Sequence, residues 1–488
     1  MRKVVRSLFN MSERAFDNKY SDYDESSDVV VAEGKLTQHF QADVRAHVFK
    51  LLEKLEKHSA KGTDWSDSSV YTGTTGIALL YIHLSDVFED DSYLTKALPY
   101  VQRPLASLRG TRFSFLCGDP GPLATGAYIY HRLGKKEESH KLLEKLVALR
   151  EDVVPLDSDI PDELLYGRVG YLYTLLYVRK NISPSAVGDA LLRQVISSVL
   201  RSGQQLYHRL GKKEESHKLL EKLVALSEDV VPLDSDIPDE LLYGRVGYLY
   251  ALLYVRKNIS PSAVGDALVR QVISSVLRSG QQLAKRLKIA SPLMYEWHDS
   301  YYLGAAHGLA GILYMLLQAR EQLSASEMQS LIEPSITYYL GLRYPSGNFP
   351  SSLGSQTDKL IHWCHGAPGA IHLLALAYTV FGADAYLKGA RKCSDVIWSR
   401  GLLKKGYGIC HGTAGNGYAF LRMFQLTGDA KYLHRAAKFC EWCFDYGKHG
   451  CRVADRPYSL FEGMAGTVYF MADMLQPEKS AFPAFQLF

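Results

Sequence analysis

Hydrophobic residues gather in eight short runs along the chain, and each run is opened by the pattern Gly-x-x-Gly. The runs are apolar on most faces of a helix, as in "GLAGILYMLL" and "GTTGIALLYIHL". Such runs predict helices that are buried on more than one side. The first glycines of the eight runs are Gly73, Gly118, Gly167, Gly244, Gly308, Gly366, Gly412 and Gly463.

The segments between these runs have a different pattern, with apolar residues at a helical period and one charged face. Examples are "QADVRAHVFKLLEKLEKH" and "AKYLHRAAKFCEWCFDYG". They predict amphipathic outer helices, and the alternation of inner and outer helices is typical of a helical repeat array. A dense set of inner helices favours a closed ring over an open array. The glycine pairs would let backbones approach closely at the helix starts, although packing alone also explains them.

One segment occurs twice in the sequence. Each copy holds an outer, an inner and another outer helix, so the second copy adds three helices and breaks the alternation. We therefore expect one copy to stand in the ring and the other to bulge out or pack imperfectly. Residues 130–206 return as 207–283 with three changes, Arg150 to Ser227, Thr174 to Ala251 and Leu192 to Val269.

Composition narrows the class of protein. A hydrophobic content of 47% with 22% charged residues is ordinary for a well-packed soluble protein. The net charge of +4 leaves no strongly basic stripe, which argues against a nucleic-acid partner. We find no signal-peptide or transmembrane pattern, and Arg2 stands where myristoylation needs glycine, so we expect a cytoplasmic protein. Seven cysteines, an odd number, favour free thiols or metal ligands over a disulfide framework.

Two of the cysteines lie in the same motif, Cys-His-Gly-x-x-Gly, at Cys364 and at Cys410. Two thiolates and an imidazole suit Zn²⁺, and three protein ligands leave the fourth position open, as in catalytic zinc sites. Chemistry alone does not choose between His365 and His411 as the third ligand. Two buried free cysteines are the simpler alternative. The "CEWC" at 440–443 lies in an amphipathic helical pattern and lacks the βαβ context of a redox motif.

Other titratable residues stand at the starts of the inner helices. Their shared position predicts a common cavity in which a histidine or carboxylate moves protons, although a histidine at a helix start can also be structural. Two cations near the same rim, Lys405 and Arg452, suit the carboxylates of a small anionic ligand. The titratable residues are His307 before Gly308, Glu462 before Gly463, and the acidic pair Asp162 and Glu163 shortly before Gly167.

These motifs resemble those of eukaryotic LanC-like proteins, the lanthionine synthetase C-like relatives of bacterial lantibiotic cyclases. The resemblance rests on "LLYGRVGYLYALL", "HWCHGAPG", "LLKKGYGICHGTAGNGY" and "PYSLFEGMAGT", and it covers roughly residues 12–488 apart from the extra copy. It implies an all-α fold, a seven-fold α/α toroid with a double ring of inner and outer helices. Eight glycine-pair units minus the copied one leave seven. We expect residues 1–34 to be a mobile amino-terminal segment and residues 35–488 to form a single toroid domain.

The resemblance also implies a site and a reaction. Glutathione would bind at the open zinc position and add, as a thiolate, to dehydroalanine or dehydrobutyrine residues of formerly phosphorylated proteins. The copy leaves two candidates for the acidic group in proton transfer. The implied residues are Cys364, Cys410 and His411 for zinc, Lys405, Arg452 and Arg14 for glutathione, and His307 with Glu163 or its twin Glu240 for proton transfer.

Two other functions compete with this one. A signalling adaptor that binds zinc and glutathione without catalysis, with kinase or other signalling partners at the membrane, would need the zinc ligands but not His307. Peripheral contact with the plasma membrane or a nuclear pool would fit that role. An α/α-toroid glycosidase would need two facing carboxylates and no thiols, and the Cys-His-Gly motifs argue against it.

Overall fold

Helices make up almost all of the regular structure. In a computed structural model of the chain, the described residues are 14–62, 65–106, 108, 110–154, 160, 166–183, 185–187, 191, 237–258 and 265–487. Among them the only sheet is a small antiparallel pair, β1 (Val31–Ala32) and β2 (Lys35–Leu36). The fold is therefore built by packing helix on helix.

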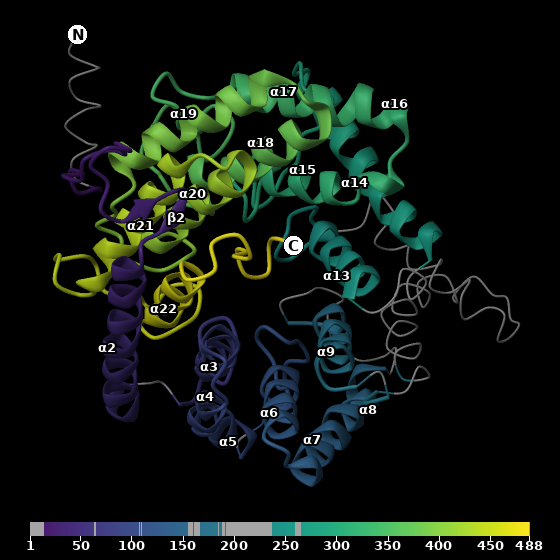
Figure 1. The fold of residues 1–488 in the computed structure, drawn as a ribbon. Helices are drawn as coiled ribbons and strands as arrows, with labels where there is room; N and C mark the ends of the chain where they lie inside the picture. Colours follow the sequence, from purple (N-terminus) through teal and green to yellow (C-terminus); the bar gives the residue numbers. More distant parts are fainter. Residues whose placement is uncertain are drawn as a thin grey trace, which may run out of the picture.

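The apolar runs form the inner helices of a ring (Figure 1). Each inner helix packs against the next one along the chain, and α22 packs against α3 to close the circle. The prediction of an all-α toroid is confirmed. The inner helices are α3 (Thr74–Phe88), α6 (Pro120–Arg132), α9 (Arg168–Asn181), α13 (Arg245–Asn258), α15 (Leu309–Gln318), α18 (Ala367–Phe381), α20 (Thr413–Thr427) and α22 (Met464–Asp473).

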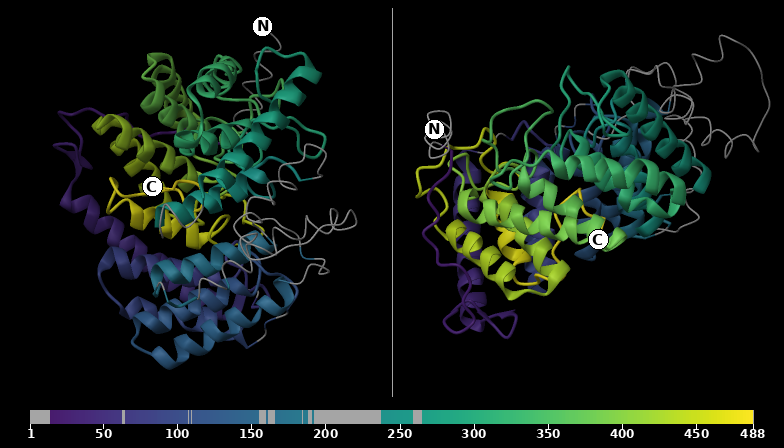
Figure 2. Two further views of the ribbon diagram at one scale, coloured as in Figure 1. Left: turned by 90° about the vertical axis from the view of Figure 1, so that its right-hand side faces the viewer. Right: turned by 90° about the horizontal axis from the view of Figure 1, so that it is seen from above.

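The amphipathic segments form an outer layer against these helices. Helix α15 buries nine consecutive residues, Leu309 to Leu317, whereas outer helices such as α19 keep an exposed charged face. Two views at right angles show the outer helices on the flanks of the ring (Figure 2). The outer helices are α2 (Gln38–Gly62), α4 (Ser92–Ala97), α5 (Pro99–Leu105), α7 (Lys136–Ala148), α8 (Arg150–Val153), α14 (Asp266–Leu287), α17 (Glu333–Gly341), α19 (Asp384–Arg400) and α21 (Ala430–Phe444), with the short segments η2 (Arg320–Gln322), α16 (Ala325–Glu327) and η3 (Met328–Ile332).

Both tandem copies contribute an inner helix to the ring. Helix α9 of the first copy packs between α6 and α13, and α13 of the second copy packs between α9 and α15. The prediction that one copy bulges out is wrong for these two helices. Their sequences are nearly identical and equally apolar, so each gains by burial in the ring. The described residues thus hold eight inner helices, one more than the resemblance implied, and residues 192–236 lie outside them.

The amino-terminal segment is also packed, which corrects the expectation of a mobile segment for residues 14–34. We call residues 14–37 the strap. The strap starts beside the loop that leads to α20, where Ala15 pairs with Leu403 in an antiparallel bridge. Residues 1–13 lie outside the described part of the chain.

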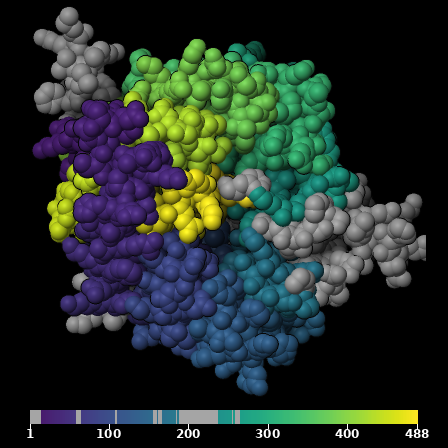
Figure 3. All heavy atoms as spheres, in the orientation of Figure 1, coloured from purple at the N-terminus to yellow at the C-terminus, as the bar shows by residue number. Residues whose placement is uncertain are grey.

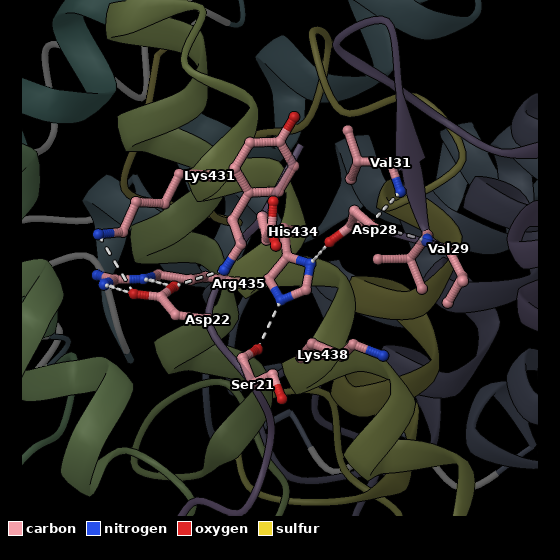
Figure 4. A network of polar contacts seen from close by, with 12 residues as sticks. Ser21, Asp22, Asp28, Val29, Val31, Lys431, His434, Arg435 and Lys438 are labelled. Carbon is pink, nitrogen blue, oxygen red and sulfur yellow. Dashed lines mark hydrogen bonds and ion pairs between the residues drawn. The ribbon is translucent and has the colours of Figure 1, made fainter. Parts of the chain in front are cut away.

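The strap is held by two buried basic side chains of α21 (Figure 4). Arg435 donates hydrogen bonds of 3.0 and 2.7 Å to the carboxylate of Asp22. His434 pairs with Asp28, and its Nε2 lies 3.0 Å from the carbonyl oxygen of Ser21. Buried charges are costly without partners, and the polar strap supplies these partners.

The carboxyl-terminal residues lie inside the ring, near the centre of the face in the space-filling view (Figure 3). Phe482 stacks on Trp363 with ring centres 4.5 Å apart, and Phe485 lies 4.5 Å from Tyr314. Because Trp363 directly precedes Cys364, the tail supports one of the two cysteine loops from behind.

Candidate functional site

The second glycine of each pair fixes the loop that enters an inner helix. A Cβ atom at Gly369 would collide with the carbonyl oxygen of Trp363, and one at Gly415 would collide with that of Ile409. Only glycine permits this close approach of backbone to backbone. The two carbonyl groups belong to the residues just before Cys364 and Cys410. The glycines therefore set the position of both cysteines.

Hydrogen bonds between neighbouring loops then bring the thiols together. The Cys364 N–H donates to the Cys410 carbonyl at 3.3 Å, and the Cys410 N–H donates to the Phe461 carbonyl at 2.9 Å. One ligand atom each from Cys364, Cys410 and His411 lies within 4.8 Å of the other two. Both cysteines are buried, with exposures of 8% and 9%.

The structure distinguishes the two adjacent histidines. His411 belongs to the cluster, whereas the ring of His365 lies 5.7 Å from that of Tyr302. The backbone differs at the next residue, because Gly366 has φ +118° and Gly412 has φ −133°. The same tripeptide therefore presents its histidine differently in the two loops.

The donor set fits a zinc ion. Two thiols and one imidazole are ligands that Zn²⁺ prefers, and three of them leave a fourth position for another group. The pKa of the Cys410 thiol stands well above its usual range because of its hydrogen bond with Cys364 and its burial. A bound divalent cation reverses this effect, since it favours the thiolate. A bound cation would therefore stabilise two thiolates that lie this close together.

Cationic residues gather beside this cluster. The Lys404 N–H donates to the Arg14 carbonyl at 3.0 Å, and the Arg452 N–H donates to the Lys404 carbonyl at 2.8 Å. The three segments that carry Arg14, Lys405 and Arg452 thus lie side by side. The guanidinium of Arg452 pairs with Asp455 at 2.6 Å, on the exposed side of its loop.

Burial is the main cause that lowers the pKa of His362 to about 3, and the charges of His411, Lys405 and Arg14 lower it further. The effect of these charges places Lys405 and Arg14 near the metal-ligating loops. Both residues are therefore close enough for their charges to act on His362, two positions before Cys364.

A histidine–carboxylate pair stands elsewhere on the same rim. The Nδ1 atom of His307 lies 2.8 Å from the Oε2 atom of Glu240, whose side chain is only 2% exposed. Glu240 also accepts the backbone N–H groups of Leu242, at 2.9 Å, and of Tyr243. Trp297 stacks on the His307 ring at 4.1 Å. The partner of His307 is thus Glu240 of the second copy, while Glu163 and Asp162 lie outside the described residues.

The residue just before the first glycine occupies an equivalent position in all eight units. Five of these residues line a cavity of about 550 Å³, and the others include the metal-cluster histidine. Sequence reasoning noticed the histidines and Glu462 here but missed the remaining four, although the same offset from the glycine would have found them. The eight residues are Thr72, Cys117, Tyr166, Tyr243, His307, His365, His411 and Glu462.

The cavity and the metal cluster adjoin. Tyr71 lines the cavity and stacks on Phe461 with ring centres 4.6 Å apart, and the carbonyl of Phe461 accepts the Cys410 N–H. The ring of Tyr302 lies 6.5 Å from that of His307 and 5.7 Å from that of His365. A substrate in the cavity would therefore contact His307 at one side and approach the cluster at the other.

The cysteines of the Cys-x-x-Cys sequence stay apart from this site. Cys440 and Cys443 are both 0% exposed on α21, and burial raises the pKa of each thiol. They are core residues, as the helical pattern indicated.

Comparison with known proteins identifies the family. The model of the lanthionine synthetase C-like proteins matches residues 64–217 and 196–487, so the chain belongs to that family. A similar protein is "Glutathione S-transferase LANCL1" of Danio rerio, 41% identical over 481 residues, with 98% of this chain and 100% of that protein covered. The solved structure of nisin cyclase matches with a TM-score of 0.44 and 16% identity, over 90% of this chain and 94% of that one. Within the described residues, no helix has the length and apolar character needed to cross a membrane.

Proposed function

We propose that the protein is a zinc-dependent transferase that adds glutathione to dehydroalanine and dehydrobutyrine residues in proteins. The observation that carries this proposal is the Cys364–Cys410–His411 cluster, and the His307–Glu240 pair, whose histidine lines the cavity, supports it. The relative from Danio rerio, which bears the name of a glutathione S-transferase, supports the choice of co-substrate.

Each group has a defined task in this proposal. Cys364, Cys410 and His411 would hold the zinc ion, which keeps the sulfur of glutathione deprotonated at neutral pH. Arg14 and Lys405 supply positive charge for the carboxylates of glutathione. Arg452 takes part once its guanidinium leaves Asp455. The cations thereby orient the tripeptide with its sulfur toward the cavity.

The second task is proton transfer. Addition of sulfur to the β-carbon turns the dehydro residue into an enolate, which must take a proton at its α-carbon. His307 is the acid that donates this proton, because it lines the cavity. Glu240 accepts the Nδ1–H of His307, so that the other ring nitrogen faces the substrate with its proton. Trp297 fixes the plane of the ring from behind.

A mass-spectrometric addition assay tests the proposal. Zinc-loaded protein, glutathione and a peptide with one dehydrobutyrine should give a product that has gained one glutathione. The product should be absent with Cys410→Ala and strongly reduced with His307→Ala. Cys393→Ala is the matched control, because Cys393 is a buried thiol on α19 outside the site. Full activity of His307→Ala would remove this residue from the role of acid.

The same assay separates the enzyme from a non-catalytic adaptor. An adaptor would bind zinc and glutathione yet give no adduct. Protein substrates that have lost phosphate from phosphoserine or phosphothreonine, and a cytosolic site where thiols stay reduced, belong to the proposed enzyme. Signalling or kinase partners, at the membrane or in the nucleus, belong to the adaptor.

A further inference from the structure

Three neighbouring rings, which we call the row, belong to the lining of the cavity. Tyr166, Tyr243 and His307 all line it. The ring centres of Tyr166 and Tyr243 are 6.4 Å apart, and those of Tyr243 and His307 are 6.0 Å apart. The two distances between ring centres are similar, and the row ends at His307, the residue that we propose as the acid.

The presence of two tyrosines instead of one follows from the tandem duplication. Tyr166 and Tyr243 are the same residue in the two copies, since 166 plus the repeat length of 77 is 243. Both stand directly before the first glycine of their unit. A ring of helices with a single copy would hold only one tyrosine here. The duplication thus adds one tyrosine ring to the row.

Other side chains hold these rings in place. The guanidinium carbon of Arg112 lies 4.7 Å from the ring centre of Tyr166. Trp297 stacks on Tyr243 at 5.4 Å and on His307 at 4.1 Å, and it does not line the cavity itself. The row is thus a supported surface. Rings that are already fixed lose little conformational entropy when a ligand stacks on them.

The steps match the repeat of an extended polypeptide. A β-strand rises about 3.3 Å per residue and less when strongly twisted, and alternate residues share one face, so two residues on that face stand about 6.6 Å apart. With a dehydro residue at His307, the residues two and four positions away on one side would lie on Tyr243 and Tyr166. Aromatic side chains stack on tyrosine rings with a gain beyond their burial.

We infer that the cavity selects substrate polypeptides that bind in an extended form with aromatic residues two and four positions from the dehydroamino acid. This inference rests on the proposed function and names its substrate class. The outer of the two subsites, at Tyr166, exists only because the segment is duplicated.

Synthetic peptides with one dehydrobutyrine test the inference. One series carries Phe at two, at four, or at both positions on the amino side, a second series does so on the carboxyl side, and Leu replaces Phe in the reference peptides. We expect kcat/KM for glutathione addition to rise about fivefold per Phe on one of the two sides. Equal values for Phe and Leu at both positions on both sides would overturn the inference. Glutathione addition to no peptide at all would instead contradict the proposed function.

Two variants of Tyr166 then test whether this ring forms the outer subsite. Tyr166→Leu should abolish the preference for Phe at four residues and leave that at two residues, whereas Tyr166→Phe should retain both. Thermal melting and zinc content of the two variants show that each is folded and loaded. If Tyr166→Leu, folded and loaded, keeps the preference at four residues, the assignment of this ring is wrong.

Discussion

The two Cys-His-Gly loops have the same three residues, yet they use them differently. In the loop before α20, both Cys410 and His411 join the cluster that could hold a metal ion. In the loop before α18, Cys364 joins it but His365 does not, and its ring lies near Tyr302 instead. A motif therefore identifies the chemistry of a site, while the neighbouring loops decide which of its residues take part.

The backbone explains this difference. Gly366 has a positive φ, which other residues rarely adopt, and its loop is fixed by Asn348. The Asn348 carbonyl oxygen Oδ1 accepts the Ala367 N–H at 2.9 Å, and its Nδ2 donates to the Leu360 carbonyl at 3.0 Å. A Cβ added at Gly412 would instead meet backbone atoms of Tyr407 and Gly408 first. An asparagine outside the motif thus helps to fix the loop that carries His365.

The largest expected effect separates the two histidines by metal content. His411→Ala should lose most of its bound zinc, as Cys364→Ala and Cys410→Ala should, because a site with only two remaining ligands binds zinc weakly. His365→Ala should keep about one zinc per chain, since its ring is not a ligand in the proposed site. Metal analysis after gel filtration measures both. Equal loss of zinc in His365→Ala and His411→Ala would show that the two motifs contribute alike.

The tandem copies raise a similar question, namely which of two equivalent glutamates, Glu163 or Glu240, takes part in proton transfer. Glu240→Gln should lower the rate of glutathione addition about 10- to 100-fold, because a neutral amide holds the tautomer of His307 less well and does not stabilise its charged form. Glu163→Gln is the matched variant in the other copy and should leave the rate within about twofold. Single-turnover kinetics with zinc-loaded protein make the comparison. A larger effect of Glu163→Gln would assign the proton-transfer role to the first copy.

Much of the fold followed from burial patterns that the sequence displays. Eight apolar runs with amphipathic segments between them predict an inner and an outer layer, and the structure has both. The number of inner helices in the ring could not be predicted from these burial patterns. Alternation of inner and outer helices suggested that one copy would be left out, yet α9 and α13 bury equally well side by side.

The sequence predicts those parts of the site that depend only on the residue types within one motif. Cys364 and Cys410 were found because their motif repeats, but the choice of His411 over His365 needs the three-dimensional positions of the two loops, which differ in backbone conformation at Gly366 and Gly412. The packed strap was missed for a related reason. Its acidic residues have the sequence pattern of a solvated segment. The partner of Asp22 is the buried Arg435, which lies 413 positions further along the chain and cannot be identified from the local sequence.

A glycine substitution tests the backbone difference between the loops. Gly366→Ala should lower the free energy of unfolding by about 2–3 kcal/mol, because its φ of +118° with ψ −162° suits only glycine and the new Cβ would meet the Leu360 carbonyl. Gly382→Ala is the control, since it also has a positive φ but nothing lies within 4 Å of the added Cβ. It should cost about 1 kcal/mol. Urea unfolding of both variants measures the difference, and equal costs would mean that the close approach at Gly366 is not needed.

The smallest expected effect concerns the strap, which touches the loop of the second motif. Burial alone would raise the pKa of Asp22, but its hydrogen bonds and charge contact with Arg435 lower it to about 2. Because the folded pKa is depressed, the stabilisation is present above the unfolded value near 3.9 and is lost as the pH falls toward 2. Asp22 is 38% exposed, so solvent screening limits the contribution to less than about 1 kcal/mol. Asp22→Asn should therefore lower stability slightly at pH 7 and equal the wild type near pH 2. A difference that stays constant over this range would show that the charge of Asp22 does not hold the strap.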